Sequence, residues 1–306
     1  MFTARTRKGL GLFAGLAVAS LALAGCGGGS SDPLSNGGGD ASASSDTIVV
    51  GSQAYYSNEI IAEIYAQALE GAGKTVTRQF QIGQRDAYIP LLESGAVSLF
   101  PEYSGNLLQY FDKNTTARTA DQVYAALPAA LPDGLKVLDQ SSATDQDSYT
   151  VTKAFADANG LTSIADLAKV TTPLTLGGNA ELAQRPYGPS GLEQTYGVKV
   201  NFSATGETTV DDLVAGTINV ANVYTADPRI QTDNLVTLAD PKGLFLASNV
   251  VPVVSSSQVA DEVSDVINKV SAALTPEGLV QLNVQSTVDQ KSPADIAKAW
   301  LSANGF

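Results

Sequence analysis

The side chains that could do chemistry in this chain are its carboxylates, arginines and tyrosines, because the sequence contains no histidine. The absence of histidine excludes a Ser-His-Asp triad, a Cys-His pair, histidine-ligated zinc and the usual general base near neutral pH. Two carboxylates could still act as acid and base, but no acidic spacing here selects such a pair. The glycine-containing segments 177–178 and 188–191 match neither dinucleotide-binding nor P-loop spacing. We therefore expect no catalytic residue, no cofactor and no metal ion.

The first residues have the pattern of an export signal. A positively charged start, carried by Arg5, Arg7 and Lys8, precedes an uncharged, mostly apolar run over residues 9–24. This run is shorter than the roughly 20 residues that a membrane-spanning helix needs. We therefore predict a cleaved signal peptide over residues 1–25 rather than a transmembrane helix.

A lipid anchor is expected directly after this signal. Residues 23–26, Leu-Ala-Gly-Cys, resemble a bacterial lipobox, in which the cysteine is acylated and begins the mature protein. An ordinary signal peptide with an incidental cysteine is the alternative. Cys26 is the only cysteine, which excludes an intramolecular disulfide. Residues 26–45 are mostly small and polar and predict a flexible tether, so we expect an extracytoplasmic protein anchored to a bacterial membrane through Cys26.

The length and charge of the remaining chain limit the possible folds and binding partners. Beyond residue 45 lie about 260 residues, enough for one large domain or two of about 130. The net charge is −13, from 18 Lys and Arg against 31 Asp and Glu. This acidic balance argues against a basic surface for nucleic acid or anionic lipid.

Strand and helix patterns alternate along this part of the chain. Residues 47–52 are β-rich and end in small residues, and residues 59–71 carry a helical apolar stripe that stops at glycines. Further strands are expected at 75–82, 97–100, 149–152, 174–178, 219–224 and 250–254, and further helices at 87–94, 164–169, 210–215, 259–274 and 293–304. Strands separated by helices predict parallel α/β sheets. The pattern leaves open where the chain would cross between two lobes.

Five segments form an ordered series: residues 51–53 (Gly-Ser-Gln), 63–70 (EIYAQALE), 101–105 (Pro-Glu-Tyr-Ser-Gly), 240–242 (Asp-Pro-Lys) and 291–305, which starts with Lys-Ser-Pro and ends with Asn-Gly. This series resembles the glycine betaine/carnitine/choline-binding proteins of osmoprotectant ABC transporters, over almost the whole chain beyond the tether. The resemblance implies a type II periplasmic-binding-protein fold, with two α/β lobes and a ligand cleft between them. It assigns residues 46–148 plus 248–306 to lobe 1 and residues 149–247 to lobe 2.

The resemblance also implies a cage of aromatic side chains. A trimethylammonium group has no N–H to donate, so aromatic faces and nearby negative charge must hold it. The matching motifs place Tyr103, Tyr149 and Tyr224 in the cage, with Asp147 adding negative charge. Each tyrosine could instead be an ordinary half-buried packing residue. Tyr65, Tyr88, Tyr110, Tyr124 and Tyr196 are expected to be packing residues, and Tyr55, Tyr56 and Tyr187 stay undecided.

A second subsite would hold a ligand carboxylate. The resemblance assigns it to Arg185, whose guanidinium fork suits a carboxylate, with Gln53 and Asn106 as polar partners. Arg185 could otherwise be a surface charge, and Gln53 and Asn106 could be turn or capping residues. Some relatives carry a lysine where this chain has Gln53, and residues 245–250 lack a tyrosine that many members have. The fourth cage wall is then missing or is supplied by Phe245, Tyr55 or Tyr56.

The expected function is therefore that of a solute-binding protein without catalytic activity. It would act as a monomer, close over a quaternary-ammonium compound and deliver it to the permease of an ABC importer. Arg185 favours glycine betaine among a group that includes choline, carnitine and proline betaine. Two alternatives remain: a receptor of the same fold for another small solute, such as an amino acid or polyamine, and a secreted hydrolase that uses carboxylates.

Overall fold

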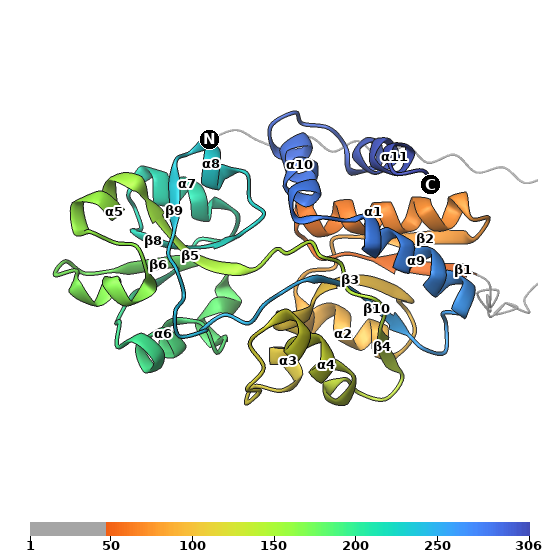
Figure 1. Cartoon of the computed structure of the whole chain (residues 1–306), viewed down its shortest axis with the longest axis horizontal. Coiled ribbons are helices and arrows are strands. Elements are labelled where there is room, and N and C mark those ends of the chain that lie inside the picture. The colour runs from red at the N-terminus through yellow and green to blue at the C-terminus, as the bar shows by residue number, and fades with distance from the viewer. Residues whose placement is uncertain (1–46) are drawn as a thin grey trace, which may run out of the picture. The chain divides into compact units, whose positions relative to one another are not determined.

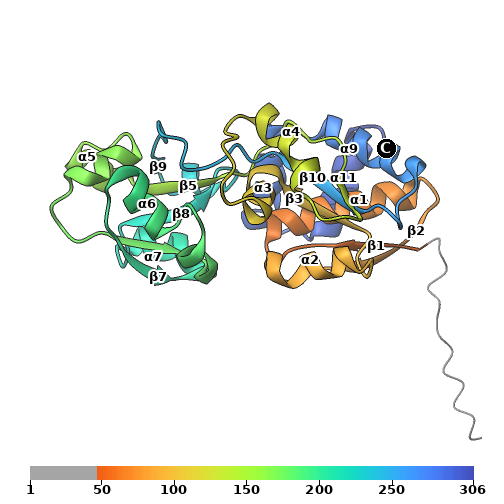
Figure 2. The same ribbon diagram turned by 90° about the horizontal axis from the view of Figure 1, so that it is seen from below.

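The computed structural model describes residues 47–306, which all belong to one compact unit. The predicted signal peptide, the tether and Cys26 lie outside the described residues. Two five-stranded sheets organise the described part of the chain, and each forms a lobe with helices around it (Figure 1, Figure 2). This architecture confirms the expected α/β fold with two lobes.

The first lobe is built on a sheet with the strand order β2-β1-β3-β10-β4. Its strands are β1 (Thr47–Gly51), β2 (Thr75–Gln79), β3 (Leu99–Tyr103), β4 (Leu135–Val137) and β10 (Val250–Ser255). β1 is parallel to β2 and β3, whereas β10 is antiparallel to both β3 and β4. The sheet is thus mixed rather than parallel, because β10 returns from the other lobe without a crossover helix to reverse its direction.

Helices cover both faces of this sheet. One face carries α1 (Tyr56–Gly71), α9 (Asp261–Ala273), α10 (Pro276–Thr287) and α11 (Pro293–Ala303), and the other carries α2 (Arg85–Glu93), α3 (Ser104–Phe111) and α4 (Ala120–Ala130). β3 shows why both faces are apolar. Leu99 packs with α1 in one core, while Phe100 packs with α2 to α4 in the other, as the alternation of strand side chains requires.

The second lobe repeats this plan with the strand order β7-β6-β8-β5-β9. Its strands are β5 (Asp147–Thr152), β6 (Thr175–Gly178), β7 (Asn201–Ala204), β8 (Val220–Tyr224) and β9 (Leu235–Thr237). Its helices are α5 (Lys153–Asn159), η1 (Ile164–Lys169), η2 (Ala180–Gln184), α6 (Pro189–Tyr196), η3 (Gly206–Thr208), α7 (Thr209–Ala215) and α8 (Arg229–Thr232). β6 is parallel to β7 and β8, and β5 is antiparallel to β8 and β9. The strand that enters from the other lobe is again the antiparallel one.

Two extended segments join the lobes, one between β4 and β5 and one between β9 and β10. They pair with each other through an antiparallel bridge between Thr144 and Asn249, and the Val250 N–H donates to the Ala143 carbonyl at 2.9 Å. The sheet strands come from residues 47–137 and 250–255 in one lobe and 147–237 in the other. The finer division of the chain at residues 148 and 248 stays a prediction.

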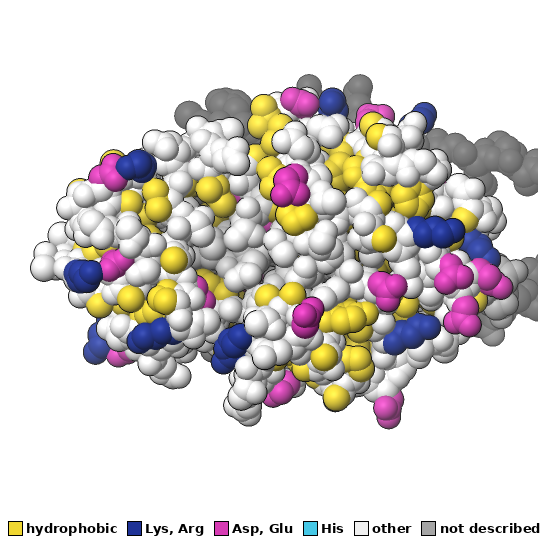
Figure 3. Space-filling model, viewed as in Figure 1, with side chains coloured by type: hydrophobic (Ala, Val, Ile, Leu, Met, Phe, Trp, Pro, Cys, Tyr) yellow, Lys and Arg dark blue, Asp and Glu magenta, His cyan; other side chains and the backbone are white. Residues whose placement is uncertain are grey.

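The described part of the chain offers neither a membrane span nor, on the face drawn, a basic surface. No helix among residues 47–306 combines the length and the apolar character needed to cross a membrane. On the face in Figure 3, acidic and basic side chains are scattered over both lobes and form no broad basic patch.

Candidate functional site

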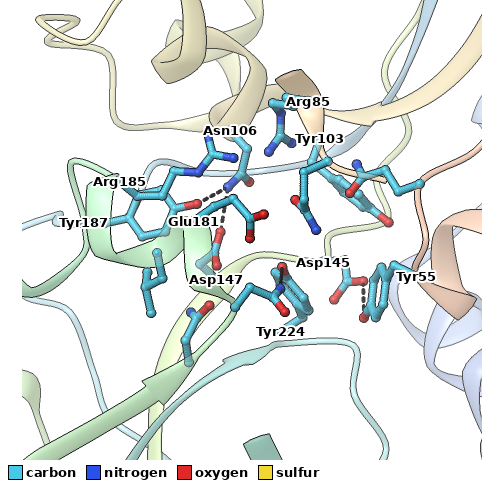
Figure 4. Close-up of a pocket in the computed structure, with 15 residues that line it drawn as sticks. Tyr55, Arg85, Tyr103, Asn106, Asp145, Asp147, Glu181, Arg185, Tyr187 and Tyr224 are labelled. Atoms are coloured by element: carbon cyan, nitrogen blue, oxygen red, sulfur yellow. Dashed lines mark hydrogen bonds between the residues drawn. The ribbon is translucent and has the colours of Figure 1, made fainter. Parts of the chain in front are cut away.

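One pocket lies where strands of both lobes end. Gln53 follows β1, Tyr103 ends β3, Asn179 follows β6 and Tyr224 ends β8. Open α/β sheets place their ligands beyond the carboxyl ends of strands, so this position is the expected one. The remaining lining residues are Tyr55, Gln84, Arg85, Asn106, Asp145, Asp147, Glu181, Leu182, Arg185, Tyr187 and Asn222 (Figure 4).

Four tyrosines line this pocket, two from each lobe. Tyr55 and Tyr103 belong to the first lobe, and Tyr187 and Tyr224 belong to the second. The rings of Tyr55 and Tyr224 meet across the lobes, with centroids 5.0 Å apart and planes tilted by 47°. The structure therefore brings Tyr103 and Tyr224 together as predicted. It also recruits Tyr55 and Tyr187, which sequence patterns left undecided.

Tyr149 does not line the pocket. Its side chain is 0% exposed, its hydroxyl donates to the backbone carbonyl of Tyr187, and its ring packs edge-on against Phe245 at 5.1 Å. Asp147 does line the pocket, but two strand residues span about 7 Å, which carries Tyr149 into the core of the second lobe. Tyr149 thus lies behind Tyr187, and this placement corrects the expectation that it forms a wall of the cage.

Two buried carboxylates reach the pocket, Asp145 from the segment that joins the lobes and Asp147 from the first position of β5. Asp145 is 2% exposed and accepts hydrogen bonds from the Tyr55 hydroxyl and the Ala226 N–H, both at 3.0 Å. Its burial raises the pKa of the Asp145 carboxyl to about 7. Asp147 accepts a hydrogen bond of 2.6 Å from Asn106. Asp145 was missed from the sequence, although its spacing of two from Asp147 in an extended segment places both on one side.

Asn106 ties the two lobes together beside the pocket. Its Nδ2 donates to the Asp147 carboxylate at 2.6 Å and to the Tyr187 hydroxyl at 3.0 Å, and its Oδ1 accepts from the Ser248 hydroxyl at 2.7 Å. The preceding Gly105 allows this approach, because a Cβ there would lie 2.6 Å from the backbone carbonyl of Ala247. Asn106 is thus a lobe-to-lobe contact and not a simple helix cap.

Arginine and amide groups gather at the opposite side of the pocket from Asp145 and Tyr55. Arg185 reaches it from the segment after η2, is half-buried, and makes no side-chain hydrogen bond or ion pair among residues 47–306. The buried Gln53 side chain donates from Nε2 to the Tyr88 hydroxyl at 3.3 Å. Arg85, which sequence patterns did not single out, also points into the pocket. The pocket therefore has Asp145 and Tyr55 at one end and the two guanidinium groups at the other, where Asp147 and Tyr187 are hydrogen-bonded to Asn106.

The fold and the pocket together define a two-lobed solute-binding protein. The crystal structure of a glycine betaine/carnitine/choline ABC transporter protein has the same fold, with a TM-score of 0.69 at 21% identity over 84% of this chain and 98% of that one. The structure of apo YehZ from Escherichia coli matches with a TM-score of 0.63 at 28% identity, over 85% and 99% of the two chains. These likenesses confirm the type II periplasmic-binding-protein fold.

The family follows from the sequence match. The model of the substrate-binding domain of the ABC-type glycine betaine transport system matches residues 46–303, and the chain belongs to this family. The glycine betaine-binding protein YehZ of Escherichia coli K12 is 26% identical over 277 residues, which cover 85% of this chain and 91% of the relative. The ergothioneine transport permease/ergothioneine binding protein EgtU of Helicobacter pylori G27 is 24% identical over 85% of this chain, which spans 48% of that relative. The chain is accordingly a substrate-binding component of ABC-type transport, as expected.

Proposed function

We propose that this protein captures a quaternary-ammonium compound, with glycine betaine as the preferred ligand and choline, carnitine and proline betaine as the other candidates. The observation that carries the proposal is the pocket of four tyrosines and two buried carboxylates, contributed by both lobes. Aromatic faces and carboxylates attract a methylated cation, which needs no hydrogen-bond acceptor. The names of the family and of the Escherichia coli relative point to the same ligand class.

The proposed ligand orientation follows from the charges at the two ends of the pocket. The trimethylammonium group would lie among Tyr55, Tyr103, Tyr187 and Tyr224, beside Asp145 and Asp147. The carboxylate of glycine betaine would face Arg185 and Gln53, because the Asn106 amide already donates both of its hydrogens, to Asp147 and Tyr187. Each desolvated cation–π contact contributes about 2 kcal/mol, so three or four contacts could support dissociation constants of about micromolar. Lobe closure excludes water and strengthens these contacts.

The tyrosine set in this proposal differs from the one expected from sequence. Tyr187 takes the place of Tyr149, and Tyr55 provides the fourth wall. Tyr187 is buried, and its hydroxyl already accepts a hydrogen bond from Asn106, which leaves the ring face as its contact surface. A cage with walls on both lobes would also stabilise the closed form when the ligand is bound, because only the closed form surrounds the cation.

A receptor for an N–H-bearing cation, such as an amino acid or a polyamine, is the second candidate. The observation in its favour is the pair of buried carboxylates, since Asp145 and Asp147 could accept hydrogen bonds from an ammonium group. Titration calorimetry of the purified protein with glycine betaine, choline, carnitine, unmethylated glycine and putrescine separates the candidates. We expect saturable binding of the methylated compounds and none of glycine. Binding of glycine or of putrescine, with no methylated compound bound, would establish the second candidate instead.

We also propose how the protein reaches its partners. The export signal and the Cys26 lipobox support an extracytoplasmic, membrane-anchored monomer, free of catalytic activity, that passes its ligand to an ABC permease. Substitution of Cys26 by serine should move the protein from the membrane fraction to the soluble fraction of the cells. A Cys26→Ser variant that stayed with the membrane would contradict the anchor.

A further inference from the structure

A buried ion pair lies directly against the proposed ligand pocket. The Arg85 guanidinium donates from Nε to Glu102 Oε1 at 2.9 Å and from Nη2 to Glu102 Oε2 at 2.7 Å. Arg85 is 5% exposed and Glu102 is 0% exposed. Two further groups donate to the same carboxylate, the Tyr88 hydroxyl and, at 2.7 Å, the backbone N–H of Tyr103. This network fixes the Arg85 guanidinium in one position, next to a tyrosine of the pocket.

One nitrogen of Arg85 is left without a protein partner. Nη1 makes no hydrogen bond among residues 47–306, although Nε and Nη2 are both engaged by Glu102. Arg85 lines the same pocket as the tyrosines, and Figure 4 shows its guanidinium pointing into that pocket between Asn106 and Tyr103. Nη1 is not among the fully buried polar atoms of the described residues that lack a partner, so it keeps some exposed surface and can donate to an acceptor on a bound molecule.

The charge of Arg85 acts on the far wall of the pocket as well. Burial raises the pKa of the Tyr187 and Tyr224 hydroxyls most, and the guanidinium of Arg85 opposes that rise at both residues. Arg85 is also the first residue of α2, so the partial positive charge of that helix end lies beside its own. The first lobe thus contributes a fixed positive charge to the pocket, and its field reaches Tyr187 and Tyr224 on the second lobe.

We propose that Arg85 binds the anionic group of the ligand. It would thereby determine the preference for quaternary-ammonium compounds that carry a carboxylate over those that lack an anionic group. This inference rests on the proposed function. Glu102 acts through Arg85 as a positioning residue, since it orients the guanidinium before the ligand arrives. Ligand binding then does not have to supply the free energy of ordering the Arg85 side chain. Arg185 differs from Arg85 because it is half-buried, unpaired among the described residues and located on the second lobe.

On the second lobe, the charge of Glu181 would oppose this preference for a carboxylate and the charge of Arg185 would support it. Glu181 lines the pocket without an ion pair or side-chain hydrogen bond in the described part of the chain, and would repel a carboxylate that came close to it. Arg185 lies on the same side and would attract one. The preorganised Arg85 therefore decides where the anionic group is held, on the first lobe and away from Glu181.

The experiment compares two ligands that share the trimethylammonium group and differ in their other end. Titration calorimetry with glycine betaine and with choline would be run on the unaltered protein, Arg85→Lys, the double variant Arg85→Gln/Glu102→Gln, and Arg185→Gln as the matched control. The double variant removes both charges, so it leaves no lone buried charge to unfold the protein, and melting curves verify folding. Glu102→Gln alone tests positioning, because it keeps the size and one acceptor oxygen of Glu102.

We expect both Arg85 variants to weaken glycine betaine binding at least tenfold and to change choline binding less than threefold. Glu102→Gln should lower the ratio of glycine betaine affinity to choline affinity and leave choline binding unchanged. Arg185→Gln should lower this ratio less than the Arg85 variants do. An unchanged ratio in the Arg85 variants would overturn the inference, and so would an unaltered protein that binds choline but not glycine betaine. In both cases capture of a quaternary-ammonium compound would stand, although the second result would replace glycine betaine with choline as the preferred ligand. An unaltered protein that bound neither compound would overturn the proposed function and this inference together.

Discussion

The tyrosines of the pocket differ in the partners of their hydroxyl groups, and the buried hydroxyl of Tyr103 has no hydrogen-bond partner among residues 47–306. The Tyr55 hydroxyl donates to Asp145, and the Tyr187 hydroxyl accepts from Asn106. Tyr149 has the same residue type and a hydrogen bond to Tyr187, yet its ring lies in the core. The role of a tyrosine in this protein therefore depends on its position along a strand and not on its identity.

This difference between the tyrosines can be measured at single positions. Tyr224→Ala should weaken binding of glycine betaine at least tenfold, because it removes one desolvated cation–π contact. Tyr149→Phe is the matched control: it removes only the hydroxyl that contacts the Tyr187 backbone and should leave affinity within about twofold. Calorimetry on both variants, with melting curves as a check of folding, tests the assignment. Unchanged affinity in Tyr224→Ala would remove Tyr224 from the cage.

Asp145 should make binding depend on pH. Burial raises the pKa of this carboxyl to about 7 in the ligand-free protein, where Tyr55 and the Ala226 N–H contact it and Asp227 lies close enough to raise the pKa further. A cation binds the ionised form better, so affinity should fall as the pH drops from 8 to 6, by up to about tenfold per pH unit. Titrations at a series of pH values test this, and Asp145→Asn should remove the dependence. A pH-independent affinity in the unaltered protein would exclude Asp145 as a cation contact.

The same carboxyl makes the stability of the fold depend on pH in the opposite direction from ligand affinity. Its pKa of about 7 in the folded chain lies above the ordinary value of 3.8, so the folded state holds a proton that the unfolded state has lost between these values. The contribution of Asp145 to stability is therefore fully present below about pH 4 and is lost as the pH rises through about 7.

The position of α3, and of Asn106 on it, depends on the close approach of Gly105 to the segment that joins the lobes. A Cβ on Gly105 would lie 2.6 Å from the Ala247 carbonyl and 2.9 Å from both the Leu246 side chain and the Ser248 hydroxyl. Gly105→Ala should therefore destabilise the protein by about 1–3 kcal/mol and weaken ligand binding, because α3 must shift away from the joining segment. Gly71→Ala is the control, since it places a methyl group where no atom lies within 4 Å. Melting temperatures of the two variants test the contact, and equal values would contradict it.

At the level of elements, most strands and several helices could be predicted from the sequence. The apolar stripe of residues 59–71 gave α1, and the terminal pattern gave α11 at Pro293–Ala303. α3 was not predicted, because it begins directly after β3 without a turn and has a glycine as its second residue. α4 carries Pro128 inside it, which breaks a helical pattern. The mixed sheets also escaped prediction, since strand direction depends on where the chain crosses between lobes.

The candidate site could be predicted only in part, for a related reason. Tyr103, Tyr224, Asp147, Asn106, Gln53 and Arg185 lie in segments with family-like motifs, and all of them line the pocket. Arg85 and Asp145 carry no such motif, and their burial and contacts arise only when the two lobes meet. Tyr149 matched a motif but lies one step too deep along β5.

For the whole molecule, we propose that ligand capture depends on movement of the two lobes about the paired joining segments. Asn106 connects the first lobe to Asp147 and Tyr187, so it stabilises the closed arrangement. Asn106→Ala should shift the ligand-free protein toward an open form and weaken glycine betaine and choline by similar factors, about three- to tenfold. Small-angle scattering with and without ligand, together with calorimetry, tests this. An unchanged scattering profile and affinity would show that Asn106 does not hold the lobes.

The most direct test of the account is a crystal structure of the protein with glycine betaine bound. We predict the trimethylammonium nitrogen within about 6 Å of the ring centroids of Tyr55, Tyr103, Tyr187 and Tyr224, beside Asp145 and Asp147. The carboxylate should point to the opposite end of the pocket, toward Arg85 and Arg185. A ligand bound outside this pocket, or bound with its carboxylate among the tyrosines, would contradict the account.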